Sequence, residues 1–259
     1  MTFPEPPTTT DASTSTSNDG SFYNPTSAET LLVRSLLIQL KLPTELALAV
    51  IDLADYYPVV RGHEATELDV PASTHRLNSA AVLYAVTNPI PEGVNGERVR
   101  TRSVSFELRS HDQGWGGDRA CRGTYSGSYT WFEACILRPI PCSPPARPLR
   151  LPYTFNPHPT AVCLNPVGYT LVPCSASSRE ETVVWHIQSN VCARSQEMVH
   201  RVEWRPGEVQ EMQPGRGIGK AFVEKLRPGD RVGVWVRALY PGWVNHVKEV
   251  SVEVKLIVD

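Results

Sequence analysis

Apolar and polar residues alternate over several segments of the chain after residue 98, with the period of two that is typical of a β-strand with one buried face. The predicted strands cover residues 104–108, 128–137, 182–189, 199–204, 232–238 and 250–258. Turns join these segments and no helical pattern separates them, which predicts a mainly β protein built as an antiparallel sandwich or jelly roll.

The N-terminal part of the chain has a different pattern. Residues 1–27 are rich in Thr, Ser, Pro and Asp and have almost no apolar side chains, which predicts a disordered tail. From 28 to 60, apolar residues recur at three- and four-residue steps, which predicts two short helices or one helix broken at Pro43. A helix cap is expected at Ser27.

Turn-forming residues divide the rest of the chain. The segment from 59 to 96 is rich in turn signals, so the β-sandwich domain is expected to cover 75–259. Residues 138–181 are rich in proline and are expected to cross the surface, with one short strand at 170–172.

Composition excludes several classes of function. The net charge of −2 provides no clustered basic surface for nucleic acid. The chain has no apolar leader and no run of about 18 apolar residues, so no membrane partner is expected and the predicted location is cytoplasmic or nuclear, not secreted. The six cysteines form no CxxC pair, which favours reduced thiols and predicts neither a metal nor a cofactor.

Two loops combine tryptophan with glycine at the ends of predicted strands: HDQGWGGD at 111–118 and YPGWVNH at 240–246. A tryptophan on such a loop needs a neighbour or a ligand to cover its ring. We therefore expect a ligand-binding site at one end of the sandwich. The residues expected to contact the ligand are Trp115, Tyr125, Trp131, Trp235, Arg237, Tyr240, Trp243 and Asn245. The alternative is that both loop tryptophans seal the core and the polar residues only close turns.

Trp235 and Arg237 face outward on the strand at 232–238. They are expected to form one wall of the same site, or to lie beneath the N-terminal helices, because an exposed tryptophan on a flat sheet favours aggregation.

The candidates for acid, base or hydrogen-bonding roles are His111, Asp112, Glu133 and His246. His111 and Asp112 are adjacent in sequence, but neighbours on a strand point to opposite faces, so adjacency does not establish a catalytic pair. Glu133 lies among aromatic residues and is a candidate general acid. No established catalytic motif accompanies these residues.

The segment LKLPTELALAVIDLADYYP at 40–58 resembles the start of an F-box, in which a Leu-Pro dipeptide opens a helix. The resemblance covers Leu42 to Tyr57 and implies a protein partner that binds the N-terminal helices. The alternative is an amphipathic helix that packs on the domain behind it.

A second resemblance covers residues 30–258. The motifs SHDQGW, GSYTWFEA, GDRVGVWVRA and YPGWVNHV resemble a group of fungal proteins with the same signature. The order of elements is similar to F-box-associated domains, which are galactose-binding-like jelly rolls that recognise glycans through aromatic loop residues. This resemblance implies a small-molecule or glycan ligand. Small fungal β proteins also include cofactor-independent cyclases, pericyclases and isomerases of natural-product pathways, so an enzyme of that class is the alternative.

Overall fold

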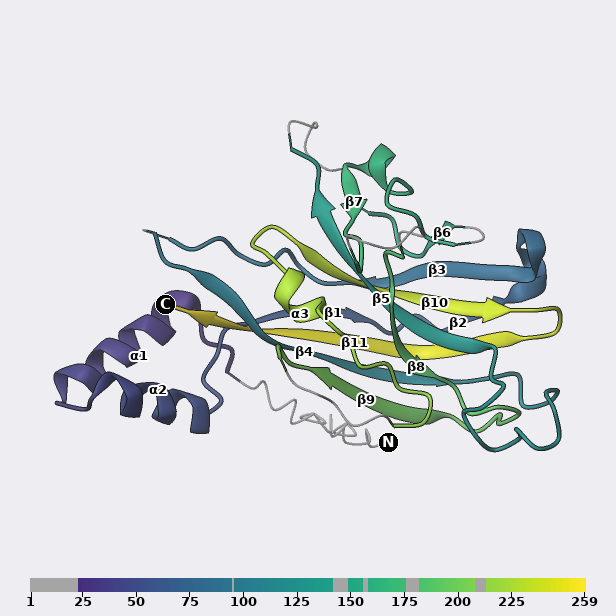
Figure 1. Cartoon of the computed structure of the whole chain (residues 1–259), viewed down its shortest axis with the longest axis horizontal. Helices are drawn as coiled ribbons and strands as arrows, with labels where there is room; N and C mark the ends of the chain where they lie inside the picture. Colours follow the sequence, from purple (N-terminus) through teal and green to yellow (C-terminus); the bar gives the residue numbers. More distant parts are fainter. Residues whose placement is uncertain (1–22, 95, 142–148, 156–157, 176–181, 208–212) are drawn as a thin grey trace, which may run out of the picture.

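Two antiparallel β-sheets packed face to face form the body of the protein, and a pair of helices lies at one end of it (Figure 1). The computed structural model describes residues 23–259 except 95, 142–148, 156–157, 176–181 and 208–212. The predicted class, a mainly β antiparallel sandwich, is confirmed. None of the helices in the described part of the chain has the length and apolar content needed to span a membrane.

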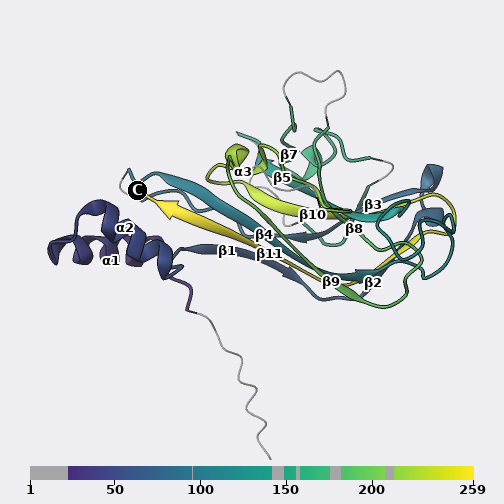
Figure 2. The same cartoon turned by 60° about the horizontal axis from the view of Figure 1, so that its bottom comes forward.

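The first sheet has the strand order β1-β11-β4-β9, and β2 also pairs with β11. Its strands are β1 (Val59–Glu64), β2 (Leu68–Pro71), β4 (Val99–His111), β9 (Met198–Trp204) and β11 (Val244–Val258). With 15 residues, β11 is about 50 Å long and runs from the loops at one end of the sandwich to the helices at the other (Figure 2).

The second sheet has the order β6-β3-β10-β5-β7, with β8 paired to β5. Its strands are β3 (Ser79–Val86), β5 (Thr130–Pro139), β6 (Tyr153–Phe155), β7 (Tyr169–Leu171), β8 (Trp185–Ser189) and β10 (Arg231–Leu239). The predicted strands at 128–137, 170–172, 182–189 and 232–238 all overlap strands of this sheet.

The main core lies between the two sheets. Val104, Phe106 and Leu108 of β4 are buried there, as their alternation with polar residues predicts. The short helix α3 (Phe222–Lys225) closes this core, because the Phe222 ring packs 5.0 Å from that of Trp204.

A second apolar cluster lies on the outer face of the second sheet, around Trp235. Trp235 is fully buried, and its indole N–H donates to the Cys135 sulfur at 3.1 Å. Leu164, Tyr169 and other residues between 149 and 184 cover it. The expectation that the N-terminal helices cover this face is therefore wrong; the proline-rich segment supplies the apolar side chains instead. Trp235 has no surface available to a ligand.

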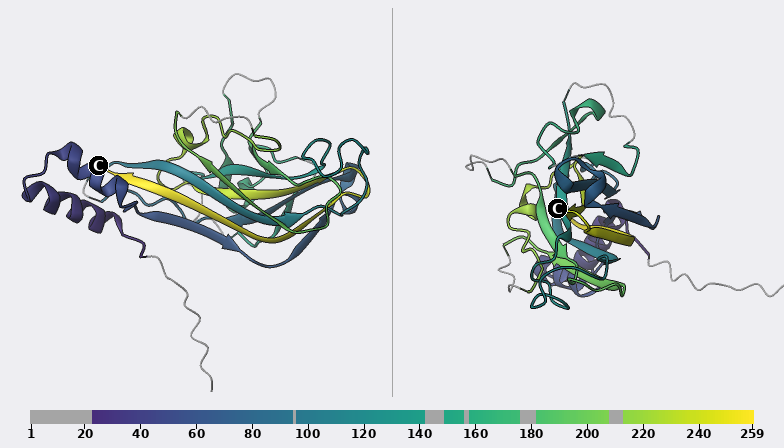
Figure 3. Two further views of the ribbon diagram at one scale, coloured as in Figure 1. Left: turned by 90° about the horizontal axis from the view of Figure 1, so that it is seen from below. Right: turned by 90° about the vertical axis from the view of Figure 1, so that its right-hand side faces the viewer.

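The N-terminal helices are α1 (Ser27–Gln39) and α2 (Thr44–Leu53), which confirms two helices rather than one. The cap of α1 is Thr26 rather than Ser27, because Thr26 and Glu29 form a reciprocal capping box. The hairpin lies beside the C-terminal end of β11, and the loops that follow β4 and precede β11 lie at the opposite end of the sandwich (Figure 3).

The sandwich extends further toward the N-terminus than the predicted start at 75, because β1 and β2 pair with β11. The β1 sequence, VVRGHE, lacks regular apolar alternation, and its only fully buried residue is Gly62. A Cβ on Gly62 would lie 2.7 Å from backbone atoms of Val86 and Thr87, so the β1 backbone packs directly against the backbone of these two residues. At the other end of the chain, Asn245 and His246 belong to β11 rather than to a loop.

Candidate functional site

The two tryptophan-containing loops lie side by side at the end of the sandwich that faces away from the helices. The backbone N–H of Val244 donates to the Gln113 side-chain oxygen at 3.2 Å. A Cβ on Gly242 would lie 3.1 Å from the Trp115 ring, and one on Gly117 would lie 3.7 Å from the Trp243 ring. Each loop therefore places a glycine against the tryptophan of the other.

Three exposed aromatic side chains gather at this end. Trp115 is 63% exposed, Tyr240 is 50% exposed and Tyr129 is 37% exposed. The ring of Tyr129 contacts that of Tyr240 edge-on at 4.6 Å and that of Trp243 at 5.2 Å. We call these four residues, Trp115, Tyr129, Tyr240 and Trp243, the loop-end aromatic patch. Trp243 is only 7% exposed, so it seals the interior while Trp115 faces solvent.

Asp112 holds the first loop in place. Its carboxylate accepts hydrogen bonds from the backbone N–H groups of Gly114, Ala193 and Arg194 at 2.7, 2.6 and 2.8 Å. The residue is fully buried, and burial raises the pKa of its carboxyl group against the opposing effect of these three bonds. Asp112 therefore anchors the loop and has no surface that faces a ligand.

A buried polar network lies beneath the patch. The Asn190 amide donates to Asn245 at 2.9 Å and to the Thr130 hydroxyl at 3.0 Å, and it accepts from Ser110 at 2.8 Å. Asn245 in turn donates to the backbone oxygens of Trp131 and Arg237. These bonds join the two sheets at the loop end. They place Asn245 in the interior, where it positions strands and is not accessible to a ligand.

His111 and His246 stack against one another on the outer face of the first sheet. Their ring centroids are 4.7 Å apart, and the two residues are direct partners in the β4–β11 register. His111 Nδ1 lies 2.6 Å from the carbonyl oxygen of Asp112, and His246 Nδ1 lies 2.6 Å from the Asp69 carboxylate. Because a carbonyl oxygen only accepts, Nδ1 of His111 carries the proton.

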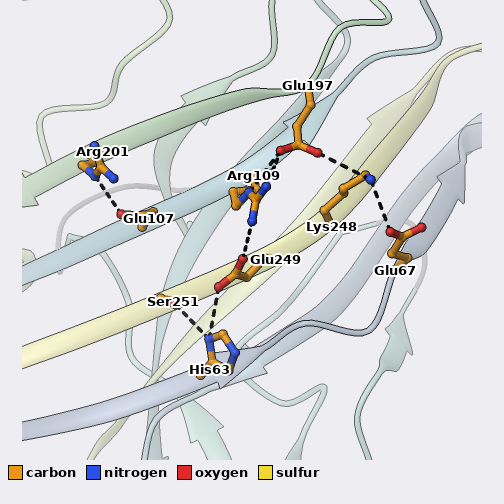
Figure 4. Close-up of polar contacts among 9 residues, drawn as sticks. All are labelled: His63, Glu67, Glu107, Arg109, Glu197, Arg201, Lys248, Glu249 and Ser251. Atoms are coloured by element: carbon orange, nitrogen blue, oxygen red, sulfur yellow. Dashed lines mark hydrogen bonds and ion pairs between the residues drawn. The ribbon is translucent and has the colours of Figure 1, made fainter. Parts of the chain in front are cut away.

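Charged side chains cover the same outer face further along β4 and β11, where Arg109 and Glu249 are partners in the register (Figure 4). Arg109 donates to Glu197 at 2.7 Å and to Glu249 at 3.0 Å, and Lys248 links Glu197 to Glu67. Positive and negative groups alternate across neighbouring strands, an arrangement that stabilises strand pairing. The face is therefore a compensated ladder of charges rather than a patch of one sign.

Glu133 and Arg237 form a buried ion pair on the opposite face of the sandwich. Arg237 donates to Glu133 at 2.8 Å and to the Ala80 carbonyl at 3.0 Å, and its guanidinium lies over the Trp131 ring. Arg237 also contacts His158 Nδ1 at 2.9 Å. Burial, followed by the Arg237 charge, lowers the pKa of His158.

Tyr125 contacts His200 and is not part of the loop-end aromatic patch. Its hydroxyl lies 3.2 Å from His200 Nε2, and a Cβ on Gly215 would lie 2.7 Å from its ring. Burial lowers the pKa of His200. The side chains at this strand end, including Ser110, His111, Asn190 and His200, surround a crevice with no room for a water molecule.

The structure therefore divides the predicted set of site residues. Trp115, Tyr240 and Trp243 lie together at the loop end. Glu133, Trp131 and Arg237 lie on the outer face of the second sheet. His111 and His246 lie on the outer face of the first sheet. Within the described residues there is no group of three or more His, Cys, Asp or Glu side chains that could hold a metal ion.

Sequence reasoning missed four residues that complete these clusters: Asp69, Tyr129, His158 and Asn190. Tyr129 carried a usable signal, since it lies just before the β5 strand in the aromatic motif GSYTW. No sequence pattern marks Asp69 or His158, because their partners, His246 and Arg237, lie far from them in the sequence.

No protein-family model, curated protein or solved structure matches the chain.

Proposed function

We propose that the protein is a binding module that recognises a glycan through the loop-end aromatic patch. The observation that carries this proposal is the Trp115 side chain, which is 63% exposed on a loop anchored by the buried Asp112 carboxylate. A large apolar ring fixed in solvent has an unfavourable hydration free energy that a ligand relieves by covering it.

The form of the patch favours a sugar over an enclosed apolar ligand. Trp115, Tyr129 and Tyr240 present open ring surfaces supported from below by Trp243. The C–H face of a pyranose ring packs on such a surface, while its hydroxyl groups remain near water and polar loop atoms. Gln113 is nearby, with its amide held by the Trp115 carbonyl and its oxygen by Val244.

The arrangement of acid–base residues supports binding rather than catalysis. A cofactor-independent cyclase, pericyclase or isomerase needs its polar groups around one pocket. Here Asp112 is buried as a loop anchor, Glu133 is engaged by Arg237, and the two histidines lie on the other sheet.

The test is a panel of immobilised gluco-, galacto-, manno- and chito-oligosaccharides, probed with the wild-type protein and with Trp115→Ala and Tyr240→Ala. We expect the wild-type protein to retain one sugar class, and each variant to weaken that binding by about tenfold, equivalent to about 1.4 kcal/mol. Tyr23→Ala is the matched control, because Tyr23 is also exposed, at 65%, but lies next to the N-terminal helices. Binding that survives both patch substitutions contradicts the proposal.

We also propose a protein partner for the N-terminal hairpin. Leu32 and Leu36 of α1 and Leu46, Val50 and Leu53 of α2 are all exposed, at helical spacing. Exposed apolar stripes of this extent are typical of protein-binding surfaces. The double variant Leu36→Glu/Leu53→Glu is expected to lose a partner that the wild-type protein retains; a partner retained equally by both proteins does not bind this face.

A further inference from the structure

A cleft of about 390 Å³ lies between the helical hairpin and the adjacent ends of β4 and β11. Its apolar lining includes Leu48, Ile51, Tyr57, Ile257 and Val258. The volume lies within the range of sites that bind small molecules. Taking about 30 Å³ for each water-sized group, it accommodates about thirteen non-hydrogen atoms.

Among the charged residues of the cleft, one guanidinium group has no carboxylate partner within the described residues. Three guanidinium groups, from Arg34, Arg100 and Arg102, and two carboxylates, from Glu45 and Asp52, line it. The lining itself has a formal charge of +1, and the neighbouring Asp259 carboxylate, which pairs with Arg100, brings the cluster to zero.

Two of the three arginines have carboxylate partners. Arg102 forms an ion pair with Asp52 and lies over the Tyr57 ring, 4.7 Å from its centroid. Arg100 donates to the Asp259 side chain at 2.6 Å. Within the described part of the chain, Arg34 and Glu45 form no ion pair, so each is left for a ligand, Arg34 for an anionic group and Glu45 for a cationic one. The fork of N–H donors on Arg34 matches the geometry of a carboxylate.

We propose that this cleft binds an apolar monocarboxylate of about ten carbons, with the acyl chain on Leu48, Ile51 and Ile257 and the carboxylate on Arg34. Leu48 is 44% exposed, and the acyl chain would cover it. This site is separate from the loop-end aromatic patch, because β11 places the two at opposite ends of a strand about 50 Å long. The proposal does not depend on glycan binding.

Calorimetric titration of the full-length protein with decanoate, decanol and decylamine tests the site. We expect decanoate to bind more tightly than the other two, which share its chain length but carry a neutral or a positive head group. Arg34→Gln should weaken decanoate binding by about tenfold and leave decanol within about twofold. Arg201→Gln is the charge-matched control, because Arg201 is exposed on β9 and outside the cleft.

Two further variants locate the ligand. Leu48→Asn should weaken binding of both decanoate and decanol, and we expect it to leave the fold intact, because Leu48 is 44% exposed. Trp115→Ala should leave decanoate binding unchanged. The proposal is overturned if decanoate does not bind at millimolar concentration, if decylamine binds more tightly, if Arg34→Gln behaves like Arg201→Gln, or if Trp115→Ala removes decanoate binding.

Discussion

The exposed ring of Trp115 lies directly over Gly242, where a Cβ would stand only 3.1 Å from its Cη2 atom. Gly242 has a φ of +86°, a conformation that residues with a side chain rarely adopt. The second loop therefore supplies both the turn and the flat surface on which the Trp115 ring rests.

Gly242→Ala should affect both stability and binding. The positive φ is expected to cost about 1–2 kcal/mol in unfolding free energy, and the added methyl group should displace Trp115 and weaken glycan binding. Urea unfolding and the oligosaccharide panel measure the two effects. Gly96→Ala is the matched control, because Gly96 has a φ of +87° with nothing within 4 Å of a built Cβ. Equal losses of glycan binding in both variants would show that strain alone is responsible.

The two arginine networks should differ sharply in their contribution to stability. The Arg237 side chain is 1% exposed and pairs with Glu133, whereas that of Arg109 is 42% exposed and pairs with Glu197 and Glu249. Arg237→Met should lower the unfolding free energy by about 3–5 kcal/mol, because it leaves a carboxylate without its buried partner. Arg109→Met should lower it by less than about 1 kcal/mol, and by less still at high salt. Chemical denaturation at two salt concentrations measures both, and similar values for the two variants would contradict this assignment.

Asp112 should give a pH-dependent contribution to stability. Burial raises the pKa of its carboxyl group in the folded protein above the ordinary value of 3.8. The folded state therefore holds this proton more tightly than the unfolded state, so the contribution is present below pH 3.8 and is lost as the pH rises through the folded pKa. We expect the unfolding free energy of the wild type minus that of Asp112→Asn to be larger at pH 4 than at pH 7. Asp118→Asn, at an exposed carboxylate of the same loop, controls for the loss of one negative charge. A difference that grows toward pH 7 would contradict the assignment.

Regular alternation was enough to predict the long strands. Val250, Val252, Val254 and Leu256 lie in β11 with their side chains in the core, because one face of that strand is buried along its whole length. The strand β1 could not be predicted in this way, because the paired edge of β11 and the close approach of Gly62 determine its place.

The candidate site was predicted only in part. The Trp-Gly loops located the loop end, where glycine permits the turns that bring Trp115 to Gly242. The sequence could not separate Trp243, which is buried, from Trp115, which is exposed, because the difference comes from Tyr129 and Gly117 packing against the Trp243 ring. The sequence placed Trp235 and Arg237 on one outward face and left open whether that face is covered; Leu164, Tyr169 and their apolar neighbours cover Trp235, and the ion pair with Glu133 fixes Arg237.

The most direct test of glycan recognition follows the indole N–H signals of the six tryptophans by NMR during titration with the most strongly retained oligosaccharide. Trp115→Phe assigns the signal of the exposed ring. We predict that the Trp115 signal shifts with saturation, while the signals of the buried Trp185, Trp204 and Trp235 stay in place. Saturable binding that leaves the Trp115 signal unmoved would contradict the loop-end aromatic patch as the binding site.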